Sequence, residues 1–277
     1  MKRKNRRMVA SYTVIIAIML LISAFIILPY IWMLASSFKS NQEILTNPKG
    51  FLPRQWTLGG YANVLSKTPF FSWFKNSLLV TTATTFMVLL TSTLTGFVFA
   101  KYEFKGKKAL FWSILAVMMV PQQITMIPTF ILINTLGLYN HLSALIIPGL
   151  VSCFGIFLCK QFIEDIPNSL CEAALIDGAG DFYIYFKVII PQIRPAIASL
   201  AIFTFLAVWN DYINPLIMLN DLENMTLPLA LSFFSDQHST DLGAIMAASA
   251  LVMLPVTIVF LAFQKQFIKG ISLTGMK

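Results

Sequence analysis

The sequence predicts an all-helical integral membrane protein with six membrane-spanning helices. Three observations lead to this prediction. Of the 277 residues, 57% are hydrophobic and only 12% are charged, a composition too apolar for a soluble domain of this length. The apolar residues gather in runs close to the ~20 residues that cross a bilayer. The basic residues cluster in alternate connecting segments, as they do in membrane proteins of fixed orientation.

Six apolar runs are expected to span the membrane. They lie at about 9–35, 76–100, 109–133, 142–163, 196–219 and 243–263. The first run follows a basic N-terminus, residues 1–8, and could pass for a secretory signal. It is much longer than the roughly 7–15-residue apolar core of such a signal, so we expect a retained helix.

The basic residues also orient the chain. If both termini are cytoplasmic, fifteen of the 20 Lys and Arg residues lie on the cytoplasmic side and five on the outer side. Such an excess marks the cytoplasmic face. The net charge of +8 then reflects membrane orientation and requires no nucleic-acid partner. We expect a multi-pass protein of the cell (inner or plasma) membrane, with residues 9–277 forming one transmembrane domain.

Three connecting segments are long enough to carry structure of their own. Segments 36–72 and 220–242 are expected outside, and segment 164–195 is expected in the cytoplasm. The first contains several Pro and Gly residues among polar ones, which predicts a folded loop with short helical pieces. A proline inside or near a span leaves a backbone carbonyl without its helical hydrogen bond, which suggests a helix that bends around a pathway. The prolines at such positions are Pro121, Pro128, Pro215 and Pro255.

Segment 164–195 is polar and helix-forming, although it lies between two apolar runs. Ser169 and Glu172 have the Ser-x-x-Glu spacing of a reciprocal helix cap, which predicts a short helix that begins at Leu170. Gly178 should end this helix, because glycine adopts the left-handed conformation at low cost. Asp181 should then cap a second helix that ends at Pro191.

The ordered pattern of this segment resembles the signature loop of permease subunits in ATP-binding-cassette (ABC) importers. The matching residues are Glu172-Ala173-Ala174, Asp177-Gly178-Ala179 and Val188-Ile189-Ile190-Pro191. The resemblance implies a type I ABC importer permease fold, with a first short helix that couples the membrane subunit to a cytoplasmic ATPase. It assigns this coupling to Glu172, Ala173, Ala174, Asp177 and Gly178. The alternative is a well-capped surface helix without a partner.

The same resemblance implies the partners. They are a second permease subunit in a heterodimer, two ATP-binding-cassette ATPase subunits, an extracytoplasmic solute-binding protein and the surrounding membrane lipid. The sequence has no Gly-x-x-x-x-Gly-Lys-Ser/Thr phosphate loop, so ATP hydrolysis is expected on a partner chain. We expect a permease without catalytic residues or cofactors.

Polar side chains inside predicted spans are functional candidates, because they are costly in lipid. Counting ~1.5 Å per residue along straight helices places the polar side chains of the third apolar run and those of the fifth at a similar depth in the membrane. Trp209 and Tyr212 add aromatic faces suited to sugar rings, and the segment around them resembles the fifth helix of maltose-type carbohydrate permeases. The candidates for a solute pathway are Gln122, Gln123, Trp209, Asn210, Asp211 and Tyr212. In the alternative, the aromatic residues anchor an interface and the polar ones pair within or between subunits.

Two rival functions remain open from the sequence. The same machine could carry another polar solute, such as a polyol or a glycerol phosphate. An ion-coupled secondary transporter is less well supported, because Asp211 is the only strong titratable candidate within a span. Neither the cysteines nor the histidines have the spacing of a metal site or a disulfide framework; they are Cys153, Cys159, Cys171, His141 and His238.

Overall fold

A computed structural model describes the backbone of residues 2–237 and 241–274 and the side chains of residues 12–232 and 241–264. His238 lies outside the described residues. Every regular element in the described ranges is helical. Backbone contacts divide the chain into two compact units. The first joins Met1–Thr68 to Leu231–Met253, and the second joins Pro69–Ala230 to Leu254–Lys277.

Four helical segments are long and apolar enough to cross a membrane. They are Tyr12–Ser36 in α1 (Lys2–Ser36), all of α4 (Phe70–Lys101), the segment Ser143–Glu164, and Leu242–Gln264 in α15 (Leu242–Thr274). The third of these contains α7 (Ser143–Ile146), the 3-10 turn η1 (Ile147–Gly149) and α8 (Cys153–Glu164). These segments coincide with four of the six predicted spans.

Two further pairs of helices are apolar enough to span a membrane but are sharply bent. Helices α5 (Lys107–Met118) and α6 (Gln122–Thr135) meet at an angle of 100°. A break of 79° separates Asp181–Gln192 from α12 (Arg194–Trp209). The described residues hold up to six candidate spans if each bent pair is counted as one. The second pair begins at Asp181, inside the segment predicted to be a cytoplasmic loop, and so differs from the predicted fifth span, 196–219. The bend near Pro121 agrees with the prediction from the prolines, because Pro121, with φ −60° and ψ 133°, cannot continue α5. The straight helix assumed in counting the depth of Gln122 and Gln123 is wrong.

The predicted fifth span, 196–219, is also interrupted. Helix α12 ends at Trp209, with Asn210 as its C-cap. A separate helix, α13 (Ile213–Met218), follows. The depth of the polar candidates therefore cannot be counted along straight helices. The remaining prolines of interest lie inside helices: Pro128 in α6, Pro215 in α13 and Pro255 in α15.

In the first unit, the segment after α1 is folded as the sequence predicts, into α2 (Asn41–Thr46) and α3 (Gly59–Lys67). Helix α3 packs closely on the start of α15, where a Cβ atom on Gly60 would lie 2.6 Å from the Gly243 carbonyl oxygen. The Asn63 amide donates to the Asp241 carboxylate at 2.9 Å. Lys39 is buried and donates to the Gly50 carbonyl. These contacts give the segment a fixed structure.

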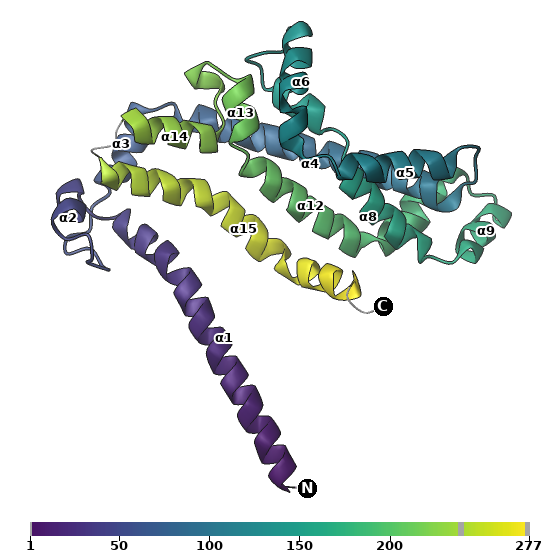
Figure 1. Ribbon diagram of the computed structural model, residues 1–277, viewed down its shortest axis with the longest axis horizontal. Coiled ribbons are helices and arrows are strands. Elements are labelled where there is room, and N and C mark those ends of the chain that lie inside the picture. Colours follow the sequence, from purple (N-terminus) through teal and green to yellow (C-terminus); the bar gives the residue numbers. More distant parts are fainter. Residues whose placement is uncertain (1, 238–240, 275–277) are drawn as a thin grey trace. The chain divides into compact units, whose positions relative to one another are not determined.

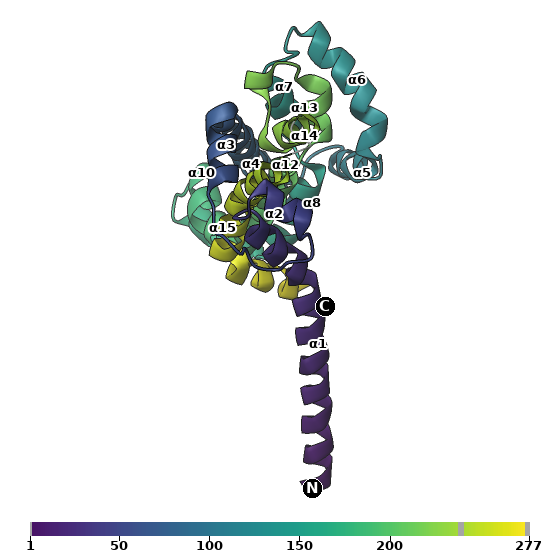
Figure 2. The ribbon, with the colours of Figure 1, turned by 90° about the vertical axis from the view of Figure 1, so that its left-hand side faces the viewer.

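The second unit is built around α4. Helices α8 and α12 run alongside it (Figure 1) and supply most of its packing. Apolar side chains of these elements form the core, and polar contacts join them at intervals. Thr91 donates to the Leu150 carbonyl at 2.9 Å, and the Lys160 ammonium lies 4.4 Å from the centre of the Phe111 ring. Figure 2 shows α6, α7 and α13 grouped at one end of this unit.

Segment 219–227 links α13 to α14 (Leu227–Gln237) through the 3-10 turn η3 (Leu222–Asn224). Helix α4 holds it from one side, because Trp73 donates to the Leu222 carbonyl at 2.7 Å and the Leu227 N–H donates to Ser77 at 2.7 Å. This segment is therefore tied directly to the central helix.

Candidate functional site: the signature loop and the polar cavity

The signature loop, residues 164–195, begins with α9 (Asn168–Ile176). The helix starts two residues earlier than predicted, with Pro167 as its N-cap and no side-chain cap. The predicted reciprocal cap between Ser169 and Glu172 is therefore wrong. The fixed φ of Pro167, −58°, and its missing N–H already suit a helix start. The Glu172 side chain is exposed.

The end of α9 agrees with the prediction. Gly178 has φ +80°, its N–H donates to the Leu175 carbonyl at 3.0 Å, and the Ala179 N–H donates to the Ala174 carbonyl at 2.9 Å. This is the Schellman motif, in which a left-handed residue allows two carbonyls of the last turn to be satisfied. Only glycine adopts such a φ without strain.

The second helical piece differs from the prediction in two details. Asp181 is the first residue of α10 (Asp181–Tyr183) and not its cap, which is Gly180. The helix continues through a π segment, η2 (Ile184–Ile189), into α11 (Ile190–Gln192). Pro191 therefore lies within the helix. The helix ends at Gln192, one residue beyond the predicted end.

The C-terminal end of α4 fixes the start of the loop. Lys101 donates to the Ile166 carbonyl, and its ammonium lies 2.8 Å from the Asn168 side-chain oxygen. Both acceptors flank the N-terminus of α9. One cation thus ties the first turn of the loop to the central helix.

Aromatic side chains fix the second half of the loop. Phe97 of α4 packs against Tyr102 at 5.4 Å and Tyr185 at 5.6 Å between ring centres, and the Tyr185 and Thr93 hydroxyls are 2.7 Å apart. Tyr102 hydrogen-bonds to the Asp181 carboxylate. Burial and then this carboxylate raise the pKa of Tyr102 to about 12. Two elements of the loop are thus bonded to the same end of α4.

Helix α9 has one packed face and one exposed face. Cys171 and Ala174 pack against the core of the unit. On the other side, Ile176 is 86% exposed, and Phe182, just beyond the glycine turn, is 76% exposed. Large apolar side chains gathered at such exposure indicate a surface that another molecule covers. Figure 1 shows α9 at the end of the second unit that lies far from α13.

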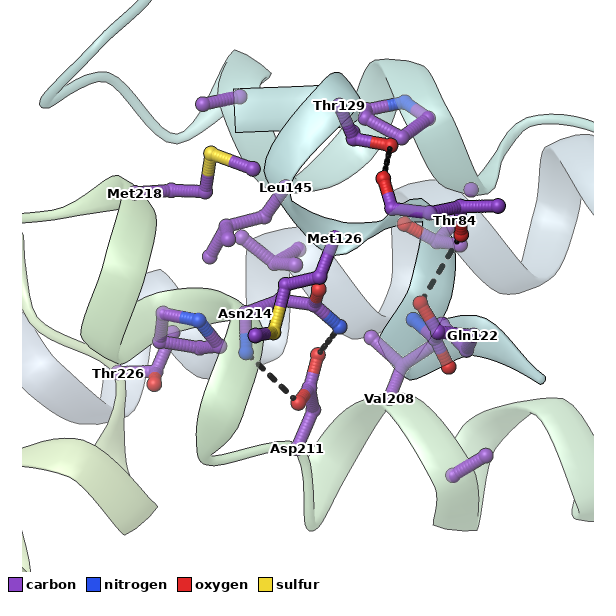
Figure 3. Close-up of a pocket in the computed structure, with 17 residues that line it drawn as sticks. Thr84, Gln122, Met126, Thr129, Leu145, Val208, Asp211, Asn214, Met218 and Thr226 are labelled. Atoms are coloured by element: carbon purple, nitrogen blue, oxygen red, sulfur yellow. Dashed lines mark hydrogen bonds between the residues drawn. The ribbon is translucent and has the colours of Figure 1, made fainter. Parts of the chain in front are cut away.

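At α13, the second unit encloses a polar cavity of about 450 Å³, within the usual range of ligand sites. Figure 3 shows the side chains of Gln122, Asp211 and Asn214 gathered around it. An adjoining cavity of about 410 Å³ shares these three residues. The polar residues that line the first cavity are Thr84, Gln122, Thr125, Thr129, Asp211, Asn214 and Thr226.

Five of the six predicted pathway residues lie together at these cavities, although they come from different elements. The adjoining cavity is lined by Gln122, Gln123, Asn210, Asp211 and Tyr212. Their proximity arises from the break between α5 and α6 and the break between α12 and α13, and not from equal counts along straight helices. The first two residues open α6, and the last three form the link between α12 and α13.

Asp211 has a local structural role as well as a place at the cavity. Its carboxylate accepts hydrogen bonds from the Asn214 backbone N–H at 3.2 Å and from the Asn214 side-chain amide at 2.7 Å. These bonds hold Asp211 against the first turn of α13, whose N-cap is Tyr212. The neighbouring Asn210 donates back to the Leu206 carbonyl at 2.8 Å.

Trp209 does not offer a face to the cavity, contrary to the prediction. Its side chain is 1% exposed. The ring stacks on Phe205 with centres 5.8 Å apart and meets the edge of Phe74 at 6.1 Å. Helix α12 turns this residue toward α4, where its large ring is buried among other aromatic rings. Of the two predicted aromatic residues, Tyr212 alone lines a cavity.

Sequence reasoning missed several residues of the cavity. Thr125 and Thr129 follow Gln122 at intervals of three and four residues, so helical periodicity could have placed all three on one face. Thr84 and Thr226 come from distant segments, and no sequence pattern connects them. Only the packing of α4 against segment 219–227 brings them to the same cavity.

Asn140 is a second residue that the sequence did not reveal. Its φ is +63°. Its side-chain oxygen accepts from the backbone N–H groups of Asn220 and Asp221 at 2.9 and 3.0 Å, and its amide donates to the Asp221 carboxylate at 2.6 Å. These bonds fix the turn after α6 to the turn after α13, so the two helices beside the cavity are held at their far ends.

Comparisons with known proteins agree with this architecture. The family model described as "Binding-protein-dependent transport system inner membrane component" matches residues 92–273, more than half of the chain. The diacetylchitobiose uptake system permease protein NgcG of Streptomyces coelicolor is 33% identical over 260 residues, covering 92% of this chain and 86% of that protein. The arabinooligosaccharides transport system permease protein AraQ of Bacillus subtilis is 32% identical over 261 residues, covering 93% of each chain.

A solved structure has the same fold. The chain matches a crystal structure of a bacterial ABC transporter involved in the import of the acidic polysaccharide alginate, with a TM-score of 0.83 and 24% identity. The match covers 93% of this chain and 97% of that chain. The resemblance found in the signature loop is thereby confirmed. The chain belongs to the family of binding-protein-dependent transport system inner membrane components, and it is a multi-pass membrane protein.

Proposed function

We propose that this chain is the permease subunit of an ATP-driven importer that carries a carbohydrate delivered by an extracytoplasmic binding protein. Named relatives that match about nine tenths of the chain support this substrate class, because they transport diacetylchitobiose or arabinooligosaccharides. The chain performs no covalent chemistry in this proposal. ATP hydrolysis takes place on two ATPase subunits, and a second permease completes the membrane unit as a heterodimer.

The signature loop supplies the contact with the ATPase. The observation that carries this step is the exposed apolar surface of α9 and α10 on a loop that is bonded to α4. A surface that moves with an ATPase subunit has to be exposed to that subunit and firmly connected to the transmembrane helices. The residues assigned to coupling are Glu172, Ala173, Ala174, Asp177 and Gly178, and the signature loop is cytoplasmic.

The cavities at α13 supply this chain's part of the solute pathway. Amides and hydroxyls offer both donors and acceptors, and a carboxylate accepts from sugar hydroxyls. Gln122, Gln123, Asn210, Asp211 and Tyr212 are the contact residues in this proposal. Trp209 does not contact the solute in this proposal. Its buried ring fixes the C-terminal end of α12 and so positions Asn210 and Asp211, the next two residues of the chain.

Orientation can be tested directly at Asp181, which is exposed. A single cysteine at this position, in a chain whose native cysteines have been replaced, should react with membrane-impermeant reagents only from the cytoplasmic side. A cysteine replacing the exposed Leu52 should react only from the outside. Reaction of the Asp181 position from the outside would overturn both the orientation and the coupling role.

Transport is tested with the complete importer in reconstituted vesicles. Uptake of a labelled neutral oligosaccharide should require both ATP and the binding protein. A flux that needs neither, that follows a proton or sodium gradient and that is lost in Asp211→Asn would identify a secondary transporter. Competition by a polyol or a glycerol phosphate, but not by sugars, would identify another polar solute as the cargo.

A further inference from the structure

The polar cavity carries a single formal charge, and this charge is negative. Asp211 is an acidic residue, and no Lys, Arg or His is present among the residues that line either cavity. The hydrogen bonds to its carboxylate come from Asn214, which is uncharged. Within the described residues, therefore, no contacting cation balances the carboxylate.

Few cations lie in the surrounding sequence. Segments 109–159 and 195–264 contain no Lys or Arg, so α4 and α12 are the only described helices lining the cavity that contain either residue. Arg194 of α12 is the first residue of that helix, and the cavity is lined by Ala207 and Val208 at its other end. The basic residue of α4 nearest to its start is Lys75, which is exposed. The connecting segment beyond α13 adds two more carboxylates, Asp221 and Glu223, and the first is bonded to the neutral amide of Asn140. Among the residues that line the cavities and the segment beyond α13, the formal charges are therefore all negative.

We propose that the polar cavity selects uncharged, hydroxyl-rich solutes and rejects anionic ones such as uronates and sugar phosphates. This inference rests on the proposed function, because it concerns the solute that passes the same cavity. A neutral sugar can donate its hydroxyls to Asp211, and the threonine hydroxyls and the Gln122 amide satisfy its other groups. A uronate or phosphate would instead bring a second negative charge into a partly desolvated space, where like charges repel strongly.

The choice of solute class follows from exclusion as well as attraction. A site that binds hydroxyls could accept many polar molecules, and the fixed negative charge removes the acidic ones. The solved structure with the same fold belongs to an importer of an acidic polysaccharide. The inference therefore predicts that two importers of one fold differ in the charge of the lining and not in the fold itself.

The charge of the cavity can be measured without any transport. In a chain whose native cysteines are replaced by alanine, Thr125→Cys places a thiol at the cavity. We compare how fast this thiol is modified by two methanethiosulfonate reagents, one with an ammonium and one with a sulfonate head group. Each rate is divided by the rate of the same reagent with a free thiol in solution. We expect the ammonium reagent to react about tenfold faster, and we expect Asp211→Asn to reduce this ratio to about one. The side-chain oxygen of asparagine can still accept from Asn214, so the fold should be kept.

A matched control uses the same helix. Leu136 is 57% exposed at the end of α6. It follows Thr125 by 11 residues, about 16 Å along a helix, which exceeds the screening length of about 8 Å in physiological salt. The reactivity ratio of Leu136→Cys should therefore be the same with and without Asp211→Asn. A second variant, Met126→Lys, adds an ammonium to the cavity while Asp211 stays in place, so the net charge becomes zero and the ratio at Thr125→Cys should again fall to about one.

The outcomes separate this inference from the proposed function. Equal corrected rates of the two reagents at Thr125→Cys, or a ratio that neither Asp211→Asn nor Met126→Lys changes, would overturn the charge selection and leave the pathway intact. If neither reagent reaches Thr125→Cys in the complete importer, with or without ATP, water-soluble molecules do not enter the cavity. The proposed pathway would then be wrong as well.

Discussion

The signature loop is held to α4 by one ammonium group and a cluster of aromatic rings, whereas the polar cavity lies where helices break. At the loop, Lys101, Phe97 and Tyr102 leave α9 little freedom relative to the central helix. At the cavity, short elements meet around open space, and hydrogen bonds hold them mainly at their ends. The first arrangement suits the transmission of force. The second suits a site that must change shape as a solute passes.

Helix α4 connects the two regions. It runs from Phe70 to Lys101 without an internal proline, and its length of 32 residues corresponds to about 48 Å. Its C-terminal end holds the signature loop, and Thr84 lines the cavity nearer its N-terminal end. Any displacement of α9 should therefore reach the cavity through one rigid element. The predictions that follow perturb either region, from the largest expected effect to the smallest.

Glu172→Lys should abolish uptake. Its carboxylate takes part in no described cap of α9, so charge reversal should leave the helix intact and disrupt only the contact with the ATPase. The matched variant is Glu223→Lys, the same change on an exposed side chain near the cavity. Co-purification of the ATPase subunits should be lost in the first variant and kept in the second. Normal uptake by Glu172→Lys with ATPase bound would remove this residue from the coupling surface.

Gly178→Val should reduce uptake nearly as much. The left-handed conformation costs an L-residue roughly 1–2 kcal/mol, and more when the side chain is β-branched. Gly180→Val is the control, because neither glycine has a neighbour within 4 Å and Gly180 has φ −80°. The pair therefore differs in backbone conformation alone. Equal uptake by the two variants would show that the turn after α9 is not required for coupling.

Gln122→Ala and Asn210→Ala should lower uptake several-fold and leave ATPase assembly unchanged. A lost hydrogen-bond partner at a desolvated site typically costs about 1–3 kcal/mol. Ile124→Ala, on an exposed part of α6 that does not line the cavities, is the control. If uptake falls only in the control, the solute does not pass by these residues.

Lys101→Met should partly uncouple ATP hydrolysis from transport. The rate of uptake should fall a few-fold, and the rate of ATP hydrolysis should fall by a smaller factor. The lost bonds join a charged donor to two acceptors, which is worth roughly 1.5–3 kcal/mol, and partial solvent exposure places the effect at the lower end. Lys105→Met is the control, because Lys105 is exposed and lies just beyond α4. An unchanged ratio of sugar imported to ATP hydrolysed would argue against α4 as the connecting element.

Tyr102→Phe should have the smallest effect at neutral pH. The raised pKa means that the fold favours the neutral phenol, so the stabilisation is complete below pH ~10 and is lost as the pH rises toward ~12. The difference in tyrosinate absorbance between the wild type and Tyr102→Phe should show this late titration. Asp181→Asn should move it to lower pH only in part, because burial is the larger cause. If Tyr102 in the wild type titrates near pH 10, its pKa is not raised and the expected environment of its hydroxyl is wrong.

The sequence by itself determined the membrane class, the approximate positions of four spans and the turn at Gly178. These properties depend on composition, on runs of apolar residues and on glycine's backbone freedom, all of which are local. The family followed from the resemblance of the signature loop to that of known permeases. It also selected five residues that meet at the cavities, although the straight-helix argument behind that choice was wrong. Local patterns cannot say whether Pro167 or Ser169 starts a helix, since both residues suit that position.

Only the tertiary structure decided which side chains face a cavity and which face the core. Trp209 and Asp211 are two residues apart, yet α12 buries the first against Phe205, and the break after α12 turns the second toward Asn214. Asn140, Thr84 and Thr226 gained their roles from segments far away in the chain. The physical reason is that burial and hydrogen-bond pairing depend on which distant backbone lies opposite a residue, and helical periodicity carries no information about that partner.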